Sequence, residues 1–330
     1  MSDILLEVKN LKTYFYTDEG VARAVDGMDF VIRKGETLGM IGESGCGKSV
    51  SALSIMQLVA SPPGRIIEGE IWFEGEDLLK KTPSEIKKIR GNDVSMIFQE
   101  PMTSLNPVFT IGNQIMEPII LHQKLDKEKA RKKAIEILDM VGISSPEKQI
   151  DNYPHQLSGG MRQRAMIAMA LSCEPKLLIA DEPTTALDVT IQAQILELLK
   201  KIREEIGMAV MMITHDLAVI AEVSDNVLVA YAGKALEYAD VKTIFREPKH
   251  PYTQALYDSI PRLTDTKKRR LEVIPGMVPN PLEFPPGCRF HPRCKFTKNV
   301  CKEEEPGLKE VSNIHKVRCF IYDENKAELF

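Results

Sequence analysis

Short apolar runs alternate with amphipathic stretches along the first 240 residues of the chain. Three of these runs occupy residues 36–41, 176–180 and 208–214. Continuous apolar runs of this length are typical of strands that are buried on both faces. The alternation of such strands with helical patterns predicts an α/β domain with a largely parallel sheet.

The stretch between the second and third runs has a helical period. Apolar residues recur there at steps of three or four, and they are Ile191, Ile195, Leu198, Ile202 and Ile206. Gly207 follows directly, and glycine is a common helix stop. The pattern predicts one helix with a single apolar face that ends at Gly207.

The chain changes character after about residue 240. Half of its 20 prolines lie in the last 90 residues, and four of its six cysteines lie within residues 288–319. We therefore predict an α/β domain over residues 1–245 and a loop-rich C-terminal region over residues 246–330.

Composition and charge exclude several functional classes. Hydrophobic residues make up 43% of the chain and charged residues 27%, which is ordinary for a globular protein. The formal net charge of −4 argues against a globally basic nucleic-acid binder. No apolar run approaches the ~18 residues of a membrane helix, and the acidic start does not resemble a signal peptide. We therefore expect a cytoplasmic chain whose cysteines are reduced rather than paired in three disulfides.

A glycine-rich segment follows the first apolar run. Residues 42–49 fit the pattern G-x-x-x-x-G-K-[ST] between a predicted strand and a helix predicted over residues 48–58. Such glycines let backbone N–H groups converge on phosphates, and the helix start adds its positive dipole end. Lys48 would reach the β- and γ-phosphates, and the Ser49 hydroxyl would bind Mg²⁺. The residues expected around the nucleotide are Gly42, Ser44, Gly45, Cys46, Gly47, Lys48, Ser49 and Val50.

Two acids, Asp181 and Glu182, follow the second apolar run. An acid at a strand end can hold Mg²⁺ through its water shell, which is the role expected for Asp181. Glu182 can orient the attacking water or accept its proton. Taken alone, the two acids could instead cap the next turn, but with the phosphate motif they predict the second half of a nucleotide site.

A third motif precedes the acids. Residues 157–163 read Leu-Ser-Gly-Gly-Met-Arg-Gln, and a helix predicted from Ser158 to about Ala170 would offer its N-terminus to an anion. With this motif the chain resembles an ATP-binding subunit of an ABC transporter. The resemblance implies a P-loop NTPase core with a mixed sheet, an antiparallel β-subdomain and a helical subdomain at about residues 100–172. It also implies that ATP lies between the phosphate loop of one subunit and Ser158, Gly159 and Gly160 of another.

Other segments match the family in order, and their roles rest on this resemblance. Gln99 resembles the Q-loop residue that binds Mg²⁺, and His215 resembles the switch histidine that contacts the γ-phosphate. Residues 186–188, which end in Asp188, resemble the D-loop. Phe15 is the best-aligned ring for stacking on adenine, with Tyr16 and Tyr14 as alternatives.

Three strings narrow the resemblance to the dipeptide/oligopeptide importer branch, which also includes nickel importers. They occupy residues 100–107, 250–252 and 287–294, while residues 22–26 and 42–47 resemble the dipeptide-type subunit. The branch implies a peripheral position on the cytoplasmic face of the membrane. Its partners would be a similar but distinct ATPase subunit, or a second copy in isolation, and two permease subunits. An extracytoplasmic peptide-binding protein would act indirectly, and no nucleic acid is expected.

The four clustered cysteines suggest a metal site. The intervals between the cysteines are five, six and 17 residues, for Cys288, Cys294, Cys301 and Cys319 in order. These intervals are longer than those between the paired cysteines of most zinc sites. Iron–sulfur clusters accept varied spacing. The region also resembles that of importer ATPases that carry a [4Fe–4S] cluster. Zinc, or free or oxidised thiols, are the alternatives.

Two other functions compete with a peptide-importer motor. The first is a non-transport ABC ATPase that acts on DNA, ribosomes or iron–sulfur assembly, but this sequence has neither the long insertions nor the second ATPase half of such relatives. The second makes the C-terminal region a redox or metal sensor that gates the ATPase.

Overall fold

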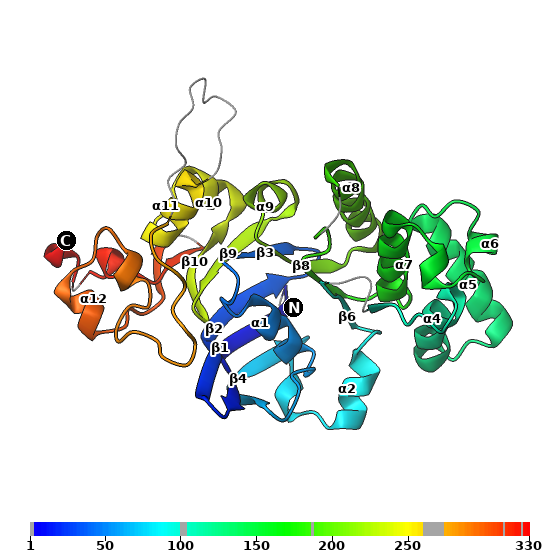
Figure 1. Ribbon diagram of the computed structural model, residues 1–330, viewed down its shortest axis with the longest axis horizontal. Helices are drawn as coiled ribbons and strands as arrows, with labels where there is room; N and C mark the ends of the chain where they lie inside the picture. Colours follow the sequence, from blue (N-terminus) through cyan, green and yellow to red (C-terminus); the bar gives the residue numbers. More distant parts are fainter. Residues whose placement is uncertain (1–2, 100–103, 186–187, 260–273, 313, 325) are drawn as a thin grey trace, which may run out of the picture. The chain divides into compact units, whose positions relative to one another are not determined.

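The computed structural model is shown in Figure 1. It describes residues 3–99, 104–185, 188–259, 274–312, 314–324 and 326–330. These residues form two compact units. The first comprises Met1–Leu5, Ile32–Thr37 and Phe73–Ile213, and the second comprises Leu6–Val31, Leu38–Trp72 and Thr214–Phe330. The phosphate motif and the C-terminal region therefore lie in one unit, while the boundary placed near residue 245 stays a prediction.

The regular elements are as follows. The strands are β1 (Ile4–Thr17), β2 (Gly20–Arg33), β3 (Thr37–Ile41), β4 (Gly64–Phe73), β5 (Glu76–Asp77), β6 (Val94–Ile97), β7 (Leu177–Asp181), β8 (Ala209–Thr214), β9 (Asn226–Tyr231), β10 (Lys234–Asp240), β11 (Lys309–Ser312) and β12 (His315–Val317). The α-helices are α1 (Lys48–Ile55), α2 (Pro83–Ile89), α4 (Ile111–Pro118), α5 (Lys127–Met140), α6 (Pro146–Gln149), α7 (Gly159–Leu171), α8 (Val189–Ile206), α9 (Leu217–Val223), α10 (Val241–Arg246), α11 (Pro251–Asp258) and α12 (Asn299–Glu303). Shorter helical turns are η1 (Leu78–Lys80), η2 (Ile119–Gln123), η3 (Pro154–Gln156), η4 (His291–Arg293), η5 (Phe320–Tyr322) and η6 (Ala327–Leu329).

Parallel strands form the core of the first unit. β7 pairs in parallel with β6 and with β8, and every residue of β7 and β8 is buried. This confirms the strands predicted at residues 176–180 and 208–214. Because the carboxyl ends of parallel strands meet at one edge, residues that follow β6 and β7 are brought close together.

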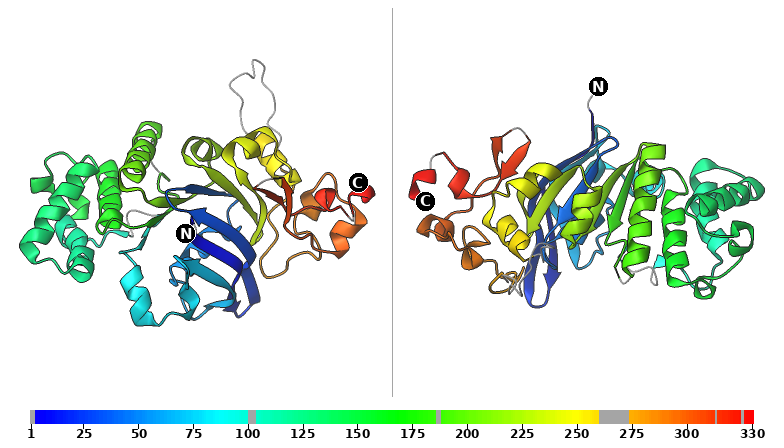
Figure 2. Two further views of the ribbon diagram at one scale, coloured as in Figure 1. Left: turned by 180° about the vertical axis from the view of Figure 1, so that it is seen from behind. Right: turned by 90° about the horizontal axis from the view of Figure 1, so that it is seen from above.

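A group of helices belongs to the same unit. α5 packs against α4, α6 and α7, and α4 also packs against α7. Both views in Figure 2 show these teal and green helices side by side. α7 confirms the helix predicted from Ser158 to about Ala170, and the Ser158 hydroxyl oxygen caps it by accepting a hydrogen bond from the Met161 N–H at 3.3 Å.

α8 confirms the predicted amphipathic helix but buries a different stripe. Gly207 ends the helix in the left-handed region with a φ of 73°, as expected for a glycine stop. Leu196 and Leu199 are buried in the core, whereas Leu198 and Ile206 are only half-buried. The helix carries more apolar positions than one face holds, so tertiary packing selects the stripe.

The second unit contains β1 between β2 and β4, and also β3, β9, β10, β12 and β11, which are neighbours in that order within a mixed sheet. β3 pairs in parallel with β9, and β9 pairs antiparallel with β10. β12 then pairs antiparallel with both β10 and β11. The fully buried β3 confirms the strand predicted at residues 36–41. α1 ends three residues earlier than predicted, because Gln57 adopts a left-handed φ of 49°.

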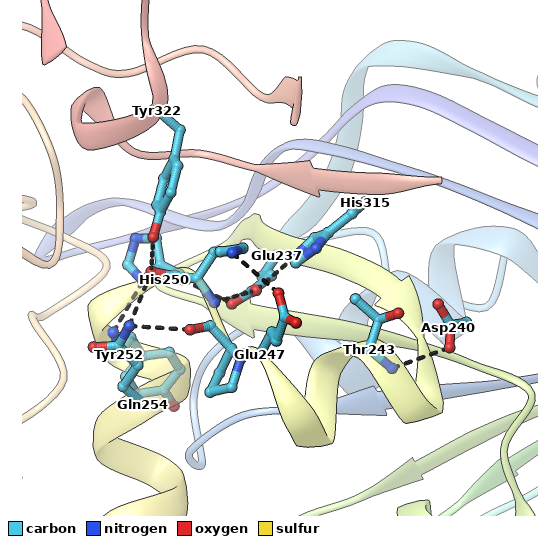
Figure 3. A network of polar contacts seen from close by, with 11 residues as sticks. Glu237, Asp240, Thr243, Glu247, His250, Tyr252, Gln254, His315 and Tyr322 are labelled. Carbon is cyan, nitrogen blue, oxygen red and sulfur yellow. Dashed lines mark hydrogen bonds and ion pairs between the residues drawn. The ribbon is translucent and has the colours of Figure 1, made fainter. Parts of the chain in front are cut away.

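A buried polar network joins β10 to the C-terminal region (Figure 3). The Glu237 carboxylate is fully buried and accepts hydrogen bonds from His315 Nε2 at 2.8 Å and from the backbone N–H groups of Lys249 and His250 at 2.7 and 2.9 Å. Burial acts to raise the pKa of Glu237, but these hydrogen bonds outweigh it and hold the pKa below its usual value. Burial lowers the pKa of His250 to about 4, so this ring is neutral at pH 7 and its Nδ1 accepts from the Tyr252 N–H at 3.0 Å.

In the described part of the chain, no helix is long and apolar enough to cross a membrane.

Candidate active site

The phosphate motif forms the turn between β3 and α1. A Cβ on Gly42 would collide with the carbonyl oxygen of Ala230, and a Cβ on Gly47 would collide with that of Ala24. Both positions therefore require glycine. Gly45 has a φ of +79°, and a Cβ built there would meet nothing within 4 Å, so the loop faces open space at this residue.

Lys48 closes the loop from inside. Its side chain is buried, and Nζ donates to the carbonyl oxygens of Gly42 at 2.6 Å and Glu43 at 3.0 Å. α1 begins at Lys48 with no acid in its first turn, so its N-terminus keeps its positive end toward the loop. A lysine, a helix start and a glycine turn together make a donor set that fits a polyphosphate.

Cys46 lies within this loop but is not an exposed thiol. Its side chain is fully buried, and burial raises its pKa above the usual value. The residue therefore fills space in the loop as a protonated thiol.

Glu182 and Gln99 meet in the first unit. Gln99, two residues after β6, donates from Nε2 to Glu182 Oε2 at 3.0 Å, and the Thr185 hydroxyl donates to the same oxygen at 2.9 Å. The Glu182 N–H donates to the carbonyl oxygen of Ile213 at 2.9 Å. Glu182 has a left-handed φ of 47°. This backbone conformation is energetically unfavourable for a glutamate, and such conformations often occur at functional sites. Asp181 is the buried last residue of β7.

The third motif begins α7 with exposed residues. Ser158 and Gly159 are exposed, and a Cβ on Gly159 would meet nothing within 4 Å. Further along, Asp188 caps α8, its Oδ1 accepting from the N–H groups of Thr190 at 3.1 Å and Ile191 at 3.0 Å. Residues 186–187 of the D-loop string, and residues 100–103 of the importer string, lie outside the described residues.

His215 and the three rings lie in the second unit. His215 is exposed directly after β8. The Tyr14 hydroxyl donates to Asp26 Oδ1 at 2.6 Å, and burial together with this bond raises the pKa of Tyr14 to about 12. Phe15 is half-buried and Tyr16 is 47% exposed. The Tyr14 hydroxyl is thus bound to Asp26. Phe15 and Tyr16, the two rings first expected to stack on adenine, have no such bond among the described residues and are more available for stacking.

The four C-terminal cysteines converge. Cys288, Cys294, Cys301 and Cys319 are unbridged and line one cavity. Burial and the three neighbouring thiols raise the pKa of Cys319 to about 12. Among the described residues, no group of three or more His, Cys, Asp or Glu side chains is arranged so that it could hold a metal ion.

Sequence patterns missed the contacts of Glu43. Its carboxylate pairs with Arg293, and its backbone N–H donates to the Tyr252 hydroxyl at 3.0 Å. The strings at residues 250–252 and 287–294 had served only as family markers. No local pattern connects residues this far apart in the chain.

Comparison with known proteins identifies the family. Residues 25–185 match the family described as "ABC transporter", and residues 236–301 match "Oligopeptide/dipeptide transporter, C-terminal region". The chain is 55% identical over 324 residues to the oligopeptide transport ATP-binding protein AppD of Bacillus subtilis (strain 168), covering 98% of each. It is 48% identical over 315 residues to the dipeptide transport ATP-binding protein DppD of Escherichia coli (strain K12), covering 96% of each.

A solved structure agrees with these matches. The dimeric ATP-binding cassette MJ0796, bound to ADP and Pi, has a TM-score of 0.65 and 29% identity, and the match covers 72% of this chain and 99% of that one. Together with the glycine loop, the acids after β7 and the Ser-Gly-Gly start of α7, the matches show that this chain belongs to the ATP-binding subunits of ABC transporters, in the oligopeptide/dipeptide importer family.

Proposed function

We propose that this chain hydrolyses ATP to drive the import of dipeptides or oligopeptides. The observation that carries the proposal is the match of residues 236–301 to the C-terminal region of such transporters, in a chain similar over its length to AppD and DppD. In this function the chain sits on the cytoplasmic face of the membrane against two permease subunits, and a peptide-binding protein delivers the solute outside. A nickel importer of the same branch is the second candidate.

The phosphate loop is the proposed ATP-binding element. Lys48 exchanges its bonds to the loop carbonyls for the β- and γ-phosphates, and backbone N–H groups of the loop hold the other phosphate oxygens. Ser49, Asp181 and Gln99 are the proposed magnesium ligands, directly or through water. When bound, Mg²⁺ offsets negative charge on the phosphates. Phe15, or Tyr16 beside it, would stack on the adenine.

Glu182 is the proposed base. Its carboxylate accepts a proton from the attacking water, and the bonds from Gln99 and Thr185 fix its orientation. His215 is the proposed contact to the γ-phosphate.

A second chain is proposed to complete the site. The start of α7 at Ser158, Gly159 and Gly160, of which the first two are exposed, would contact the nucleotide held by the partner. Asp188 is proposed to contribute as the D-loop residue. This contact needs a second ATPase chain, and we propose that the second chain is a similar but distinct subunit. The dimeric state of MJ0796 supports a paired arrangement.

Uptake by cells tests the transported solute. Deleting the gene should abolish uptake of a labelled dipeptide and of a labelled oligopeptide, and the intact gene should restore both. A matched gene that encodes Lys48→Ala should not restore them, because Lys48 holds the phosphates. Unchanged peptide uptake with lost uptake of labelled nickel would contradict the proposal and favour the nickel importer.

We also propose that the four cysteines hold a [4Fe–4S] cluster. The donor set fits, because Cys₄ ligation is typical of such clusters and all four thiols line one cavity. The wide spacing of these cysteines along the chain, with five, six and 17 residues between them, is the reason for proposing a cluster rather than zinc.

Metal analysis tests the cluster. Protein purified without oxygen should contain about four irons and four sulfides per chain and absorb broadly in the visible range. Cys294→Ser should lose this absorption, whereas Cys173→Ser, at a buried cysteine outside the site, should keep it. Stoichiometric zinc, or no metal at all, would contradict the proposal.

A further inference from the structure

The phosphate loop contains an acid at an unfavourable place. Glu43 directly follows Gly42, and its side chain is 32% exposed. A carboxylate in a loop that binds a polyphosphate repels the ligand unless a cation compensates its charge. The structure supplies such a cation from residues far along the chain.

Arg293 holds the Glu43 carboxylate with two parallel hydrogen bonds. Nη1 lies 2.7 Å from Glu43 Oε2, and Nη2 lies 3.0 Å from Oε1. The Arg293 side chain is only 4% exposed. Its Nε donates to the carbonyl oxygen of Pro275 at 2.8 Å, and Nη1 is 3.3 Å from the Tyr231 hydroxyl. A planar guanidinium held in this way fixes the direction of the carboxylate as well as its charge.

The backbone of Glu43 is also held. Its N–H donates to the hydroxyl of Tyr252, whose ring is fully buried against Tyr231 and Phe290, with centroids 4.7 and 5.3 Å away. Tyr252 and Arg293 both lie within residues 236–301, the segment that matches the C-terminal region of peptide transporters. That region therefore contacts the phosphate loop through both the side chain and the backbone of one residue.

We propose that Arg293 is a positioning residue for ATP binding. By neutralising Glu43 and directing its carboxylate, Arg293 lets the loop accept the triphosphate, and Tyr252 holds the loop backbone in the same arrangement. The proposal rests on the ATP site proposed above. It gives the C-terminal region a direct part in nucleotide affinity.

Equilibrium ATP binding to the purified full-length protein tests this role. Arg293→Gln should weaken ATP binding about 10-fold or more, because it removes two hydrogen bonds to a charged group and leaves Glu43 uncompensated. KM for ATP should rise more than kcat falls. Adding Glu43→Gln to Arg293→Gln should bring ATP binding back to within about threefold of the Glu43→Gln single variant, because the repelling charge is gone.

Three controls separate this role from general damage. Arg318→Gln makes the same change at an arginine whose side chain is 11% exposed and pairs with Glu305 and Asp29, and it should leave ATP affinity unchanged. Arg293→Lys keeps the positive charge but not the bidentate geometry, so it should weaken ATP binding less than Arg293→Gln does. Adding Glu43→Gln should relieve this loss of affinity as well. The Lys variant therefore tests the proposal even if Arg293→Gln does not fold. Thermal unfolding of each variant reports on folding.

The outcomes are distinct. Wild-type affinity in Arg293→Gln, or a loss that Glu43→Gln does not relieve, would overturn the proposal. An equal loss in Arg318→Gln would overturn it as well. Lys48→Ala, measured in parallel, should lose ATP binding. If it does not, the proposed ATP site itself is wrong, and if only Lys48→Ala loses binding, the role of Arg293 alone fails.

Discussion

Replacing Glu182 by Gln should lower the rate of ATP hydrolysis at least about 100-fold while ATP binding is kept. The amide cannot accept a proton from water, but its carbonyl oxygen can still accept the hydrogen bonds from Gln99 and Thr185. Because hydrolysis stops after binding, ATP should hold this variant in a closed dimer. Phosphate release, equilibrium ATP binding and size-exclusion chromatography with ATP measure the three effects.

A matched substitution controls for the change of charge. Glu197→Gln lies on the exposed side of α8 and should leave turnover within about twofold of wild type, as expected for a surface change. Near-normal hydrolysis in Glu182→Gln would remove Glu182 from the mechanism and leave the water to another group.

Removing residues 285–330 should prevent the chain from folding to a soluble monomer or dimer. The deletion takes away β12 from the edge of β10, His315 from the buried Glu237, and two arginines that pair with Asp26 and Glu43. A buried carboxylate that has lost its His315 partner and an open strand edge both favour aggregation. Soluble yield, size-exclusion chromatography and thermal unfolding measure the effect.

The same deletion separates a structural role from a sensor role. A sensor that gates the ATPase predicts a folded, soluble protein whose altered hydrolysis no longer responds to redox conditions. As a control, removing only residues 324–330 takes away the exposed ion pair of Lys326 with Glu304 and leaves β12 in place, so the protein should stay soluble.

The elements that carry a local signal could be predicted from the sequence. The strands around residues 36–41, 176–180 and 208–214 could be predicted from their unbroken apolar runs. The comparisons confirm the ABC ATPase fold that the sequence motifs indicated. The glycine stop at Gly207 was likewise predictable. Gln99 and Glu182 were each predicted at the site, and the structure adds the hydrogen bond between them.

Long-range pairs had no such signal. β11 and β12 lie in a segment that was expected to be loop-rich. They could not be predicted, because strands of three or four residues are too short to show an alternating pattern. The pair between Glu43 and Arg293 joins positions 250 residues apart, and nothing local marks either residue as a partner of the other. Which apolar stripe of α8 is buried depended on its neighbours rather than on its own sequence.

The pairing of β10 with β12 also has a consequence for synthesis on the ribosome. Glu237 on β10 lies opposite Val317, 80 residues later in the chain. At about 5–20 residues per second, β10 would emerge roughly 4 to 16 s before the strand that covers its edge. During this interval the backbone groups of that edge can pair with another nascent chain. The time at which β12 is synthesised thus determines when the edge of β10 can no longer pair with another nascent chain.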